Sequence, residues 1–114
     1  MLGRGFVRMM DPGTIKKIAY KKKRAKKVNE ILDILQEECA EVIQAISKCR
    51  RFGIDEIHIK SGRTQREELV QELGDVTLLI ELLKSYQVFT EAELHAAEVN
   101  KAKKLTKWST IYED

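Results

Sequence analysis

Two pairs of acidic residues have the type and spacing that cation binding requires. Glu38 and Glu41 lie three residues apart, and so do Glu72 and Asp75. Because a helix advances about 100° per residue, residues three apart share one face, so each pair points in one direction. Burying an unpaired carboxylate costs several kcal/mol or more, and burying like charges together costs more still. A bound cation is the least costly compensation.

Apolar residues surround both pairs in a helical projection, which places the acids in stripes that face a core. They are Ile34, Leu35, Val42, Ala45 and Cys49 around the first pair, and Leu69, Val76, Leu79 and Leu83 around the second. The alternative is a solvated face with acids paired to lysines, and the shared apolar stripe disfavours it. Four convergent carboxylates, without convergent His or Cys, suit Mg²⁺ or Mn²⁺ better than Zn²⁺. We therefore expect a metal-dependent site for phosphate esters or phosphoanhydrides between two helices.

The spacing of these acids resembles the signature of the MazG-like all-α nucleoside triphosphate pyrophosphohydrolases. A Glu-Glu-x-x-Glu motif at residues 37–41 is followed, after thirty residues, by Glu-x-x-Asp at residues 72–75. The segments 47–53 and 68–75 are similar to those of the small, phage-type single-domain members. The similarity covers roughly residues 28–107. It implies Mg²⁺-dependent hydrolysis, with Mn²⁺ as a possible substitute, of an NTP or dNTP at the α–β phosphoanhydride, which yields a nucleoside monophosphate and pyrophosphate.

The spacing of the acids and the position of Arg51 suggest roles for individual residues, and for Asn100 and the lysines near it the resemblance implies one. The metal ligands would be Glu38, Glu41, Glu72 and Asp75. Glu37, beside Glu41 at i,i+4, would orient or deprotonate the attacking water, and Glu68 is a weaker candidate near the metal. Substrate phosphates or the nucleoside would contact Arg51, Asn100, Lys101, Lys103 and Lys104. For the lysines an alternative is that they only oppose the dipole at a helix C-terminus.

Helices must position these residues. A chain of 114 residues fits one domain, and no alternating strand pattern competes with its helical periodicity. We expect a first motif helix over residues 28–52 that ends at Gly53, and a connection over residues 54–63. Thr64 with Glu67, and Thr90 with Glu93, form capping boxes that begin helices running to about Tyr86 and Leu105. The predicted inward seam of the first helix consists of Leu32, Leu35, Cys39, Val42, Ile46 and Cys49.

The periodicity predicts an all-α fold, and the resemblance implies a helical bundle of the MazG-like type. We expect oligomerisation, as a homodimer or homotetramer, to complete its small core. An αα-hairpin would set the two carboxylate pairs opposite one another. Gly74 lies inside the second helix, which suggests a close approach by another backbone or a ligand. Cys39 and Cys49 are interpreted as reduced core thiols. His58 is interpreted as an exposed loop residue rather than a phosphate contact.

Residues 1–27 are interpreted as a basic N-terminal extension and residues 28–114 as the MazG-like domain. Residues 1–30 carry a net charge of +8, which leaves 3 − 8 = −5 for the remainder. Residues 1–13 suggest a mobile arm, and Thr14 suggests the cap of a helix that begins at Ile15. Residues 14–27 could contact nucleic acid. The preferred interpretation is a solvated helix, because only Tyr20 interleaves the charges with an aromatic ring.

The sequence excludes some classes and leaves others open. No apolar run approaches the roughly 20 residues of a membrane span, and no signal peptide is evident, so we expect a cytoplasmic protein without membrane contact. A phosphoribosyl-ATP pyrophosphohydrolase on the same scaffold is one alternative function. A non-enzymatic, basic-armed protein that binds nucleic acid is another. The preferred base and sugar have no local signature.

Overall fold

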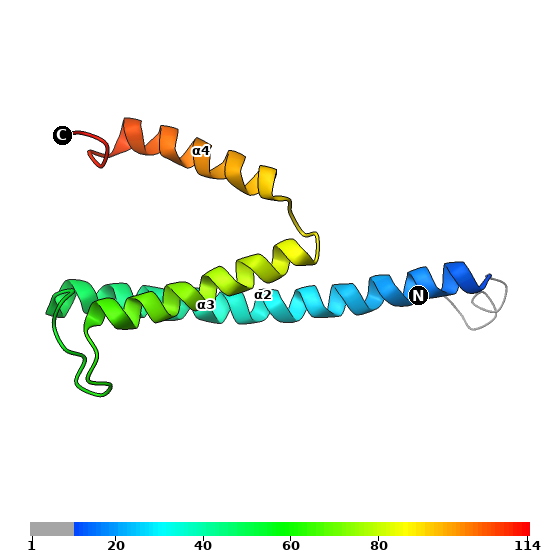
Figure 1. The fold of residues 1–114 in the computed structure, drawn as a ribbon, viewed down its shortest axis with the longest axis horizontal. Helices are drawn as coiled ribbons and strands as arrows, with labels where there is room; N and C mark the ends of the chain where they lie inside the picture. The colour runs from blue at the N-terminus through cyan, green and yellow to red at the C-terminus, as the bar shows by residue number, and fades with distance from the viewer. Residues whose placement is uncertain (1–10) are drawn as a thin grey trace.

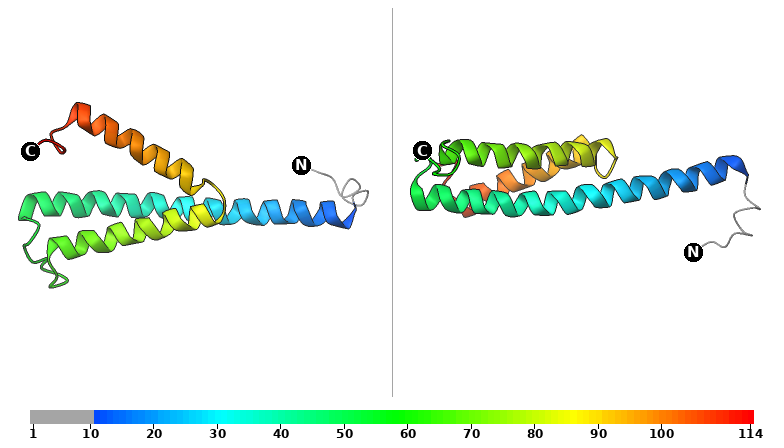
Figure 2. Two further views of the ribbon diagram at one scale, coloured as in Figure 1. Left: turned by 45° about the horizontal axis from the view of Figure 1, so that its top comes forward. Right: turned by 90° about the horizontal axis from the view of Figure 1, so that it is seen from below.

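Three helices make up most of the computed structural model, which describes residues 11–114 (Figure 1). They are α2 (Pro12–Phe52), α3 (Gln65–Ser85) and α4 (Glu91–Trp108). Across the described range the only β-type pairing is an isolated bridge between Ile57 and Thr64. The helices α2 and α3 lie side by side and antiparallel as a hairpin, and α4 turns back and diverges from it (Figures 1 and 2). The predicted all-α class is confirmed.

The helix α2 begins earlier than the sequence suggested. The carboxylate of Asp11 accepts hydrogen bonds from the backbone N–H and the hydroxyl of Thr14, both at 2.8 Å, and Pro12 occupies the first turn. The expectation that Thr14 caps the helix is wrong, because an Asp cap followed by proline is a stronger start. Of the predicted arm, residues 1–10 lie outside the described residues, whereas Pro12 and Gly13 are helical.

The predicted C-terminal end of α2 and both ends of α3 agree closely with the structure, but no break separates residues 12–27 from the predicted helix over residues 28–52. Gly53 ends α2 at φ 100°, and its N–H donates to the carbonyl of Cys49 at 3.0 Å. Both capping boxes form, at Thr64 and at Thr90. The helix α4 extends three residues beyond the predicted end at Leu105. The ammonium group of Lys84 contacts Glu81 at 2.9 Å and Glu91 at 2.6 Å, which joins the end of α3 to the start of α4.

The core is small and lies between α2 and α3. Ile31, Leu79 and Leu83 form its buried cluster, with Val28, Leu35, Tyr86 and Phe89 packed around them, and Ala45 is buried further along α2. Part of the predicted seam of α2 is wrong, because Leu32, Cys39 and Ile46 are exposed. The helix carries two adjacent apolar stripes, and periodicity alone does not tell which of them packs within the chain.

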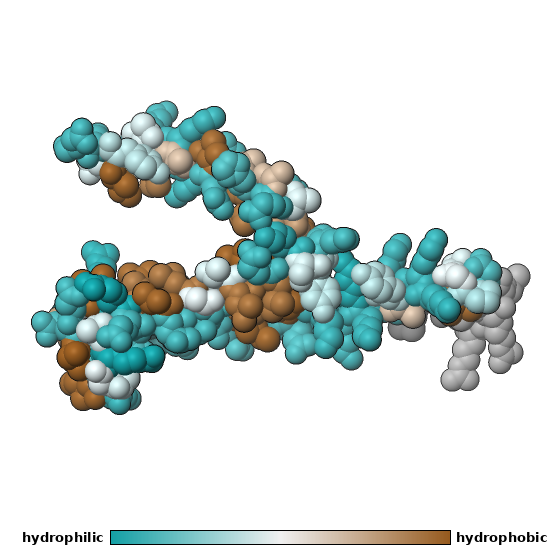
Figure 3. Space-filling view, in the orientation of Figure 1, coloured by the Kyte–Doolittle hydropathy of each residue, from teal (hydrophilic) through white to brown (hydrophobic). Residues whose placement is uncertain are grey.

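A large apolar surface remains uncovered. The radius of gyration is 21.1 Å, against about 13 Å for a compact domain of about 100 residues. The accessible surface is 9637 Å², about half as much again as the roughly 6,400 Å² typical of this mass. Figure 3 shows apolar side chains along the hairpin and along the side of α4 that faces it. None of the described helices is apolar over a length that would cross a bilayer.

Candidate metal centre

Three of the four predicted metal ligands converge between α2 and α3. Glu38, Glu72 and Asp75 each offer a carboxylate oxygen, and these oxygens lie within 4.8 Å of one another. All three residues are partly buried. Glu38 comes from α2, and the other two follow one another at i,i+3 on α3, so the hairpin itself creates the cluster. The predicted juxtaposition of the two acidic motifs is thus present for these three side chains.

The three carboxylates repel one another. Burial raises the pKa of Glu38 above its ordinary value, and the charges of Asp75 and Glu72 raise it further. A side-chain hydrogen bond with Glu72 acts in the same direction. The cluster is therefore poorly neutralised by the chain itself, and a divalent cation would relieve the repulsion.

Glu41 and Glu37 occupy different positions from the three clustered acids. Glu41 is exposed and is not a member of the 4.8 Å group. Its charge still contributes to the raised pKa of Glu38, and it lines a small cavity next to Glu72. Glu37 is exposed and, one residue before Glu38, lies about 100° around the helix from it.

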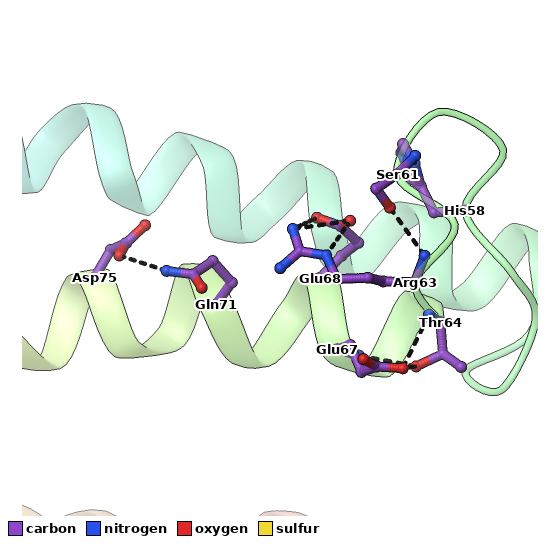
Figure 4. A network of polar contacts seen from close by, with 8 residues as sticks. All are labelled: His58, Ser61, Arg63, Thr64, Glu67, Glu68, Gln71 and Asp75. Carbon is purple, nitrogen blue, oxygen red and sulfur yellow. Dashed lines mark hydrogen bonds and ion pairs between the residues drawn. The ribbon is translucent and has the colours of Figure 1, made fainter.

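Polar contacts on α3 fix the surroundings of the cluster (Figure 4). The side-chain amide of Gln71 donates to Asp75 at 3.2 Å, which orients that carboxylate. The guanidinium of Arg63 donates to both oxygens of Glu68 at 3.1 Å. A hydrogen bond from the Ser61 side chain, together with Arg63, holds the pKa of Glu68 below its usual range. Glu68 is thus already paired, one turn before Glu72.

Two cavities lead from the cluster to the closed end of the hairpin. The smaller, of about 40 Å³, is lined by Glu41, Gln44, Ala45, Lys48, His58, Glu68 and Glu72. The larger, of about 470 Å³, has walls that include Lys48, Arg51, Phe52, Ile57, His58 and Ile59. Lys48 and His58 line both. Carboxylates, cations and an apolar space therefore follow one another along the hairpin, and the larger volume is within the range of small-molecule sites.

Sequence reasoning placed some of these residues and missed others. Arg51 lines the larger cavity, with its guanidinium carbon 5.1 Å from the centre of the Phe52 ring. Lys48 and Phe52 were not singled out, although both lie within the segment 47–53 that carried the family resemblance. His58 is partly buried and lines both cavities, contrary to the exposed position expected for a loop histidine, and its Nδ1 accepts the N–H of Ser61 at 3.4 Å.

The predicted substrate contacts on α4 do not reach the cluster in this structure. Asn100, Lys101, Lys103 and Lys104 are exposed, and α4 diverges from the hairpin (Figure 1). Neither of the two cavities beside the cluster is lined by a residue of α4. The close approach expected at Gly74 is also not found within the described chain, since a Cβ atom there would meet nothing within 4 Å.

Fold and site together define an all-α protein with clustered carboxylates at the centre of a helical hairpin. Residues 26–107 match the family described as the MazG nucleotide pyrophosphohydrolase domain. That match covers most of the chain, so the protein belongs to the MazG family. The comparisons with curated proteins and with solved structures gave no match.

Proposed function

We propose that the protein hydrolyses a nucleoside or deoxynucleoside triphosphate at the α–β phosphoanhydride, releasing a nucleoside monophosphate and pyrophosphate. The observation that carries this proposal is the convergence of Glu38, Glu72 and Asp75 in a chain of the MazG family. Carboxylate oxygens are the ligands that Mg²⁺ and Mn²⁺ prefer. The three carboxylates are partly buried and repel one another, so the cluster is destabilising unless a cation is bound.

The proposed metal ligands are Glu38, Glu72 and Asp75, with Glu41 completing the set by a change of side-chain rotamer. A bound Mg²⁺ would neutralise phosphate charge and lower the pKa of water. Gln71 holds the Asp75 carboxylate in place. Arg63 keeps Glu68 engaged, so that it does not compete as a ligand.

Residues of the cavities bind the substrate in this proposal. Lys48 and His58, which line both cavities, face the phosphates, and Arg51 offers donors to the leaving pyrophosphate. The apolar walls around Phe52 take the nucleoside. In the reaction, water adds across the α–β bridge, the bridging P–O bond breaks, and a carboxylate accepts the proton. Glu37 is the proposed acceptor.

A second copy of the chain completes the site in this proposal. A partner chain would bury the exposed apolar side chains, and it could dock between α4 and the hairpin (Figure 3). Asn100, Lys101, Lys103 and Lys104 would then reach the substrate bound to a neighbouring hairpin. A homodimer or homotetramer satisfies this arrangement.

The test is a panel of the four NTPs, the four dNTPs and phosphoribosyl-ATP, each with Mg²⁺ or Mn²⁺. We expect pyrophosphate and a nucleoside monophosphate as products from at least one triphosphate. Glu38→Gln should lose at least about 100-fold in rate. Glu37→Gln should lower kcat while Mn²⁺ affinity is unchanged. Release of orthophosphate instead of pyrophosphate, or no release with either metal, would contradict the proposal.

A further inference from the structure

The N-terminal part of α2 has chemistry that the proposed hydrolase does not use. The carbonyl of Tyr86, the residue that ends α3, accepts a hydrogen bond from Nε of Arg24 at 2.8 Å. The part of α2 before Arg24 therefore extends past the end of α3 (Figure 1). Most of this segment also precedes residues 26–107, which match the MazG family.

Three lysines and one tyrosine share one face of this segment. Lys16, Tyr20, Lys23 and Lys27 follow at i, i+4, i+7 and i+11, which places them in one row on the helix. All four side chains are exposed, Tyr20 to 68%. At 1.5 Å rise per residue the row is about 16 Å long. Its length suits an extended polyanion better than a single nucleotide.

The fold adds a second aromatic ring that the sequence did not reveal. A cavity of about 250 Å³ lies where α3 ends against α2, and its lining is Tyr20, Lys23, Arg24, Lys27 and Tyr86. Two tyrosines and three cations line this space, without a carboxylate. The bond from Arg24 to the Tyr86 carbonyl fixes one wall of it.

The cations of this row are free to bind an external anion. Between residues 11 and 114 the ion pairs involve Arg63, Arg66 and Lys84, and none involves a cation of residues 16–27. Lys27 and Glu38 are eleven residues apart on one helix, a separation of about 16 Å along its axis. The basic row is therefore distinct from the metal centre.

We propose that residues 16–27, with Tyr86, bind single-stranded nucleic acid. The lysines contact successive phosphates, and a base stacks on the exposed ring of Tyr20, in the cavity that the partly buried Tyr86 also lines. Cations combined with an aromatic platform are what sequence-tolerant single-strand binding uses. A duplex keeps its bases stacked and would leave Tyr20 without a partner. A membrane-surface helix needs a broad apolar face, and residues 16–27 offer only Ile18 as a large aliphatic residue. The proposal does not depend on the hydrolase activity.

The first test is fluorescence anisotropy of the full chain with labelled single-stranded DNA and RNA, measured across a range of salt concentrations. Lys23→Gln/Lys27→Gln should weaken binding and flatten the slope of log affinity against log salt by about 1.4, because each phosphate contact contributes about 0.7. The matched control, Lys22→Gln/Lys26→Gln, makes the same charge change about 100° around the helix. It should leave the slope unchanged. Equal losses from both double variants would overturn the proposal.

The second test concerns the aromatic ring. Tyr20→Leu should weaken binding at least about fivefold, the lower end of what stacking one base contributes, and leave the salt slope unchanged. Tyr20→Phe should bind like the wild type. Because Tyr20 is highly exposed, we expect Tyr20→Leu to fold like the wild type, and circular dichroism would check its helix content. Wild-type affinity in Tyr20→Leu would overturn the proposal. So would equal affinity for a duplex or for anionic phospholipid vesicles, or displacement by an equimolar free nucleotide.

Discussion

Glu38 is the residue on which the electrostatics of the site converge. It is partly buried, it faces Glu72 and Asp75 from the opposite helix, and these features together raise its pKa. The sequence allowed this residue to be identified, because the i,i+3 spacing and the apolar stripe were both visible. The position of Glu41 outside the close group could not be predicted, because i,i+3 spacing places two residues on one helix face without fixing how far each side chain reaches.

The raised pKa of Glu38 predicts how stability depends on pH without metal. Between the ordinary carboxyl value of 4.5 and the raised value, the folded chain binds more protons than the unfolded chain. The free energy of unfolding therefore falls as pH rises through this window. Thermal unfolding in EDTA should show Glu38→Gln more stable than wild type above the window and equal to it below pH 4.5. A wild type that is the more stable protein at neutral pH would contradict the repulsion.

Arg51 and Arg50 provide a matched pair for the substrate contact. Both arginines are exposed, but only Arg51 lines the large cavity beside Phe52. Hydrogen bonds to charged groups contribute about 1.5–3 kcal/mol, so Arg51→Gln should lower kcat/KM about 10- to 150-fold. Arg50→Gln should change it little. Steady-state kinetics would check this, and equal effects of the two substitutions would remove Arg51 from the site.

At the scale of the helices, local sequence signals predicted the helix ends correctly, but they did not predict which face of α2 packs against α3. Thr64, Thr90 and Gly53 marked their helix ends correctly, because capping depends on neighbours in the sequence. The inward stripe of α2 was partly misassigned at Leu32 and Ile46. Two apolar stripes lie side by side there, and only contacts with another element select one of them.

Two glycines should respond to alanine in opposite directions. Gly74 lies within α3 and its missing Cβ would meet nothing within 4 Å, so Gly74→Ala should raise the free energy of unfolding by about 1 kcal/mol. Gly53 has φ +100°, and a Cβ there would approach Cγ of Glu56 to 3.1 Å, so Gly53→Ala should destabilise the fold. Urea unfolding would measure both. A destabilising Gly74→Ala would indicate that a second copy or a ligand approaches α3 at that position.

At the scale of the whole molecule, the single chain is open. The helix α4 contains no fully buried residue, and apolar side chains on α2 and α3 remain exposed. Oligomerisation stays a prediction from the sequence, and the accessible surface of 9637 Å² leaves apolar area that a second copy could cover. The predicted substrate role of Asn100 and its neighbouring lysines depends on such an assembly, because α4 of the same chain diverges from the hairpin.

The outward stripe of α2 is the surface to test for assembly. Leu32, Ile43 and Ile46 follow one another on it at i, i+11 and i+14, and Ile43 is 68% exposed. We expect the wild type to elute as an oligomer in light-scattering chromatography and Ile43→Gln to elute nearer the monomer mass, because the substitution would place an amide in the expected apolar contact. Ile15→Gln is the control, at the N-terminal end of α2, where the side chain is 38% exposed and lies outside this stretch of the helix. An unchanged mass for Ile43→Gln would exclude this stripe as the contact.

We propose that the carboxylates of Glu38, Glu72 and Asp75 together hold one divalent cation. Titration of Mn²⁺ followed by electron paramagnetic resonance measures that binding directly and does not depend on a substrate. We predict saturable binding to the wild type that Glu72→Gln and Asp75→Asn each weaken by about tenfold or more, while Glu93→Gln at the start of α4 leaves it unchanged. Equal Mn²⁺ affinity in the wild type and in Glu72→Gln would contradict the claim.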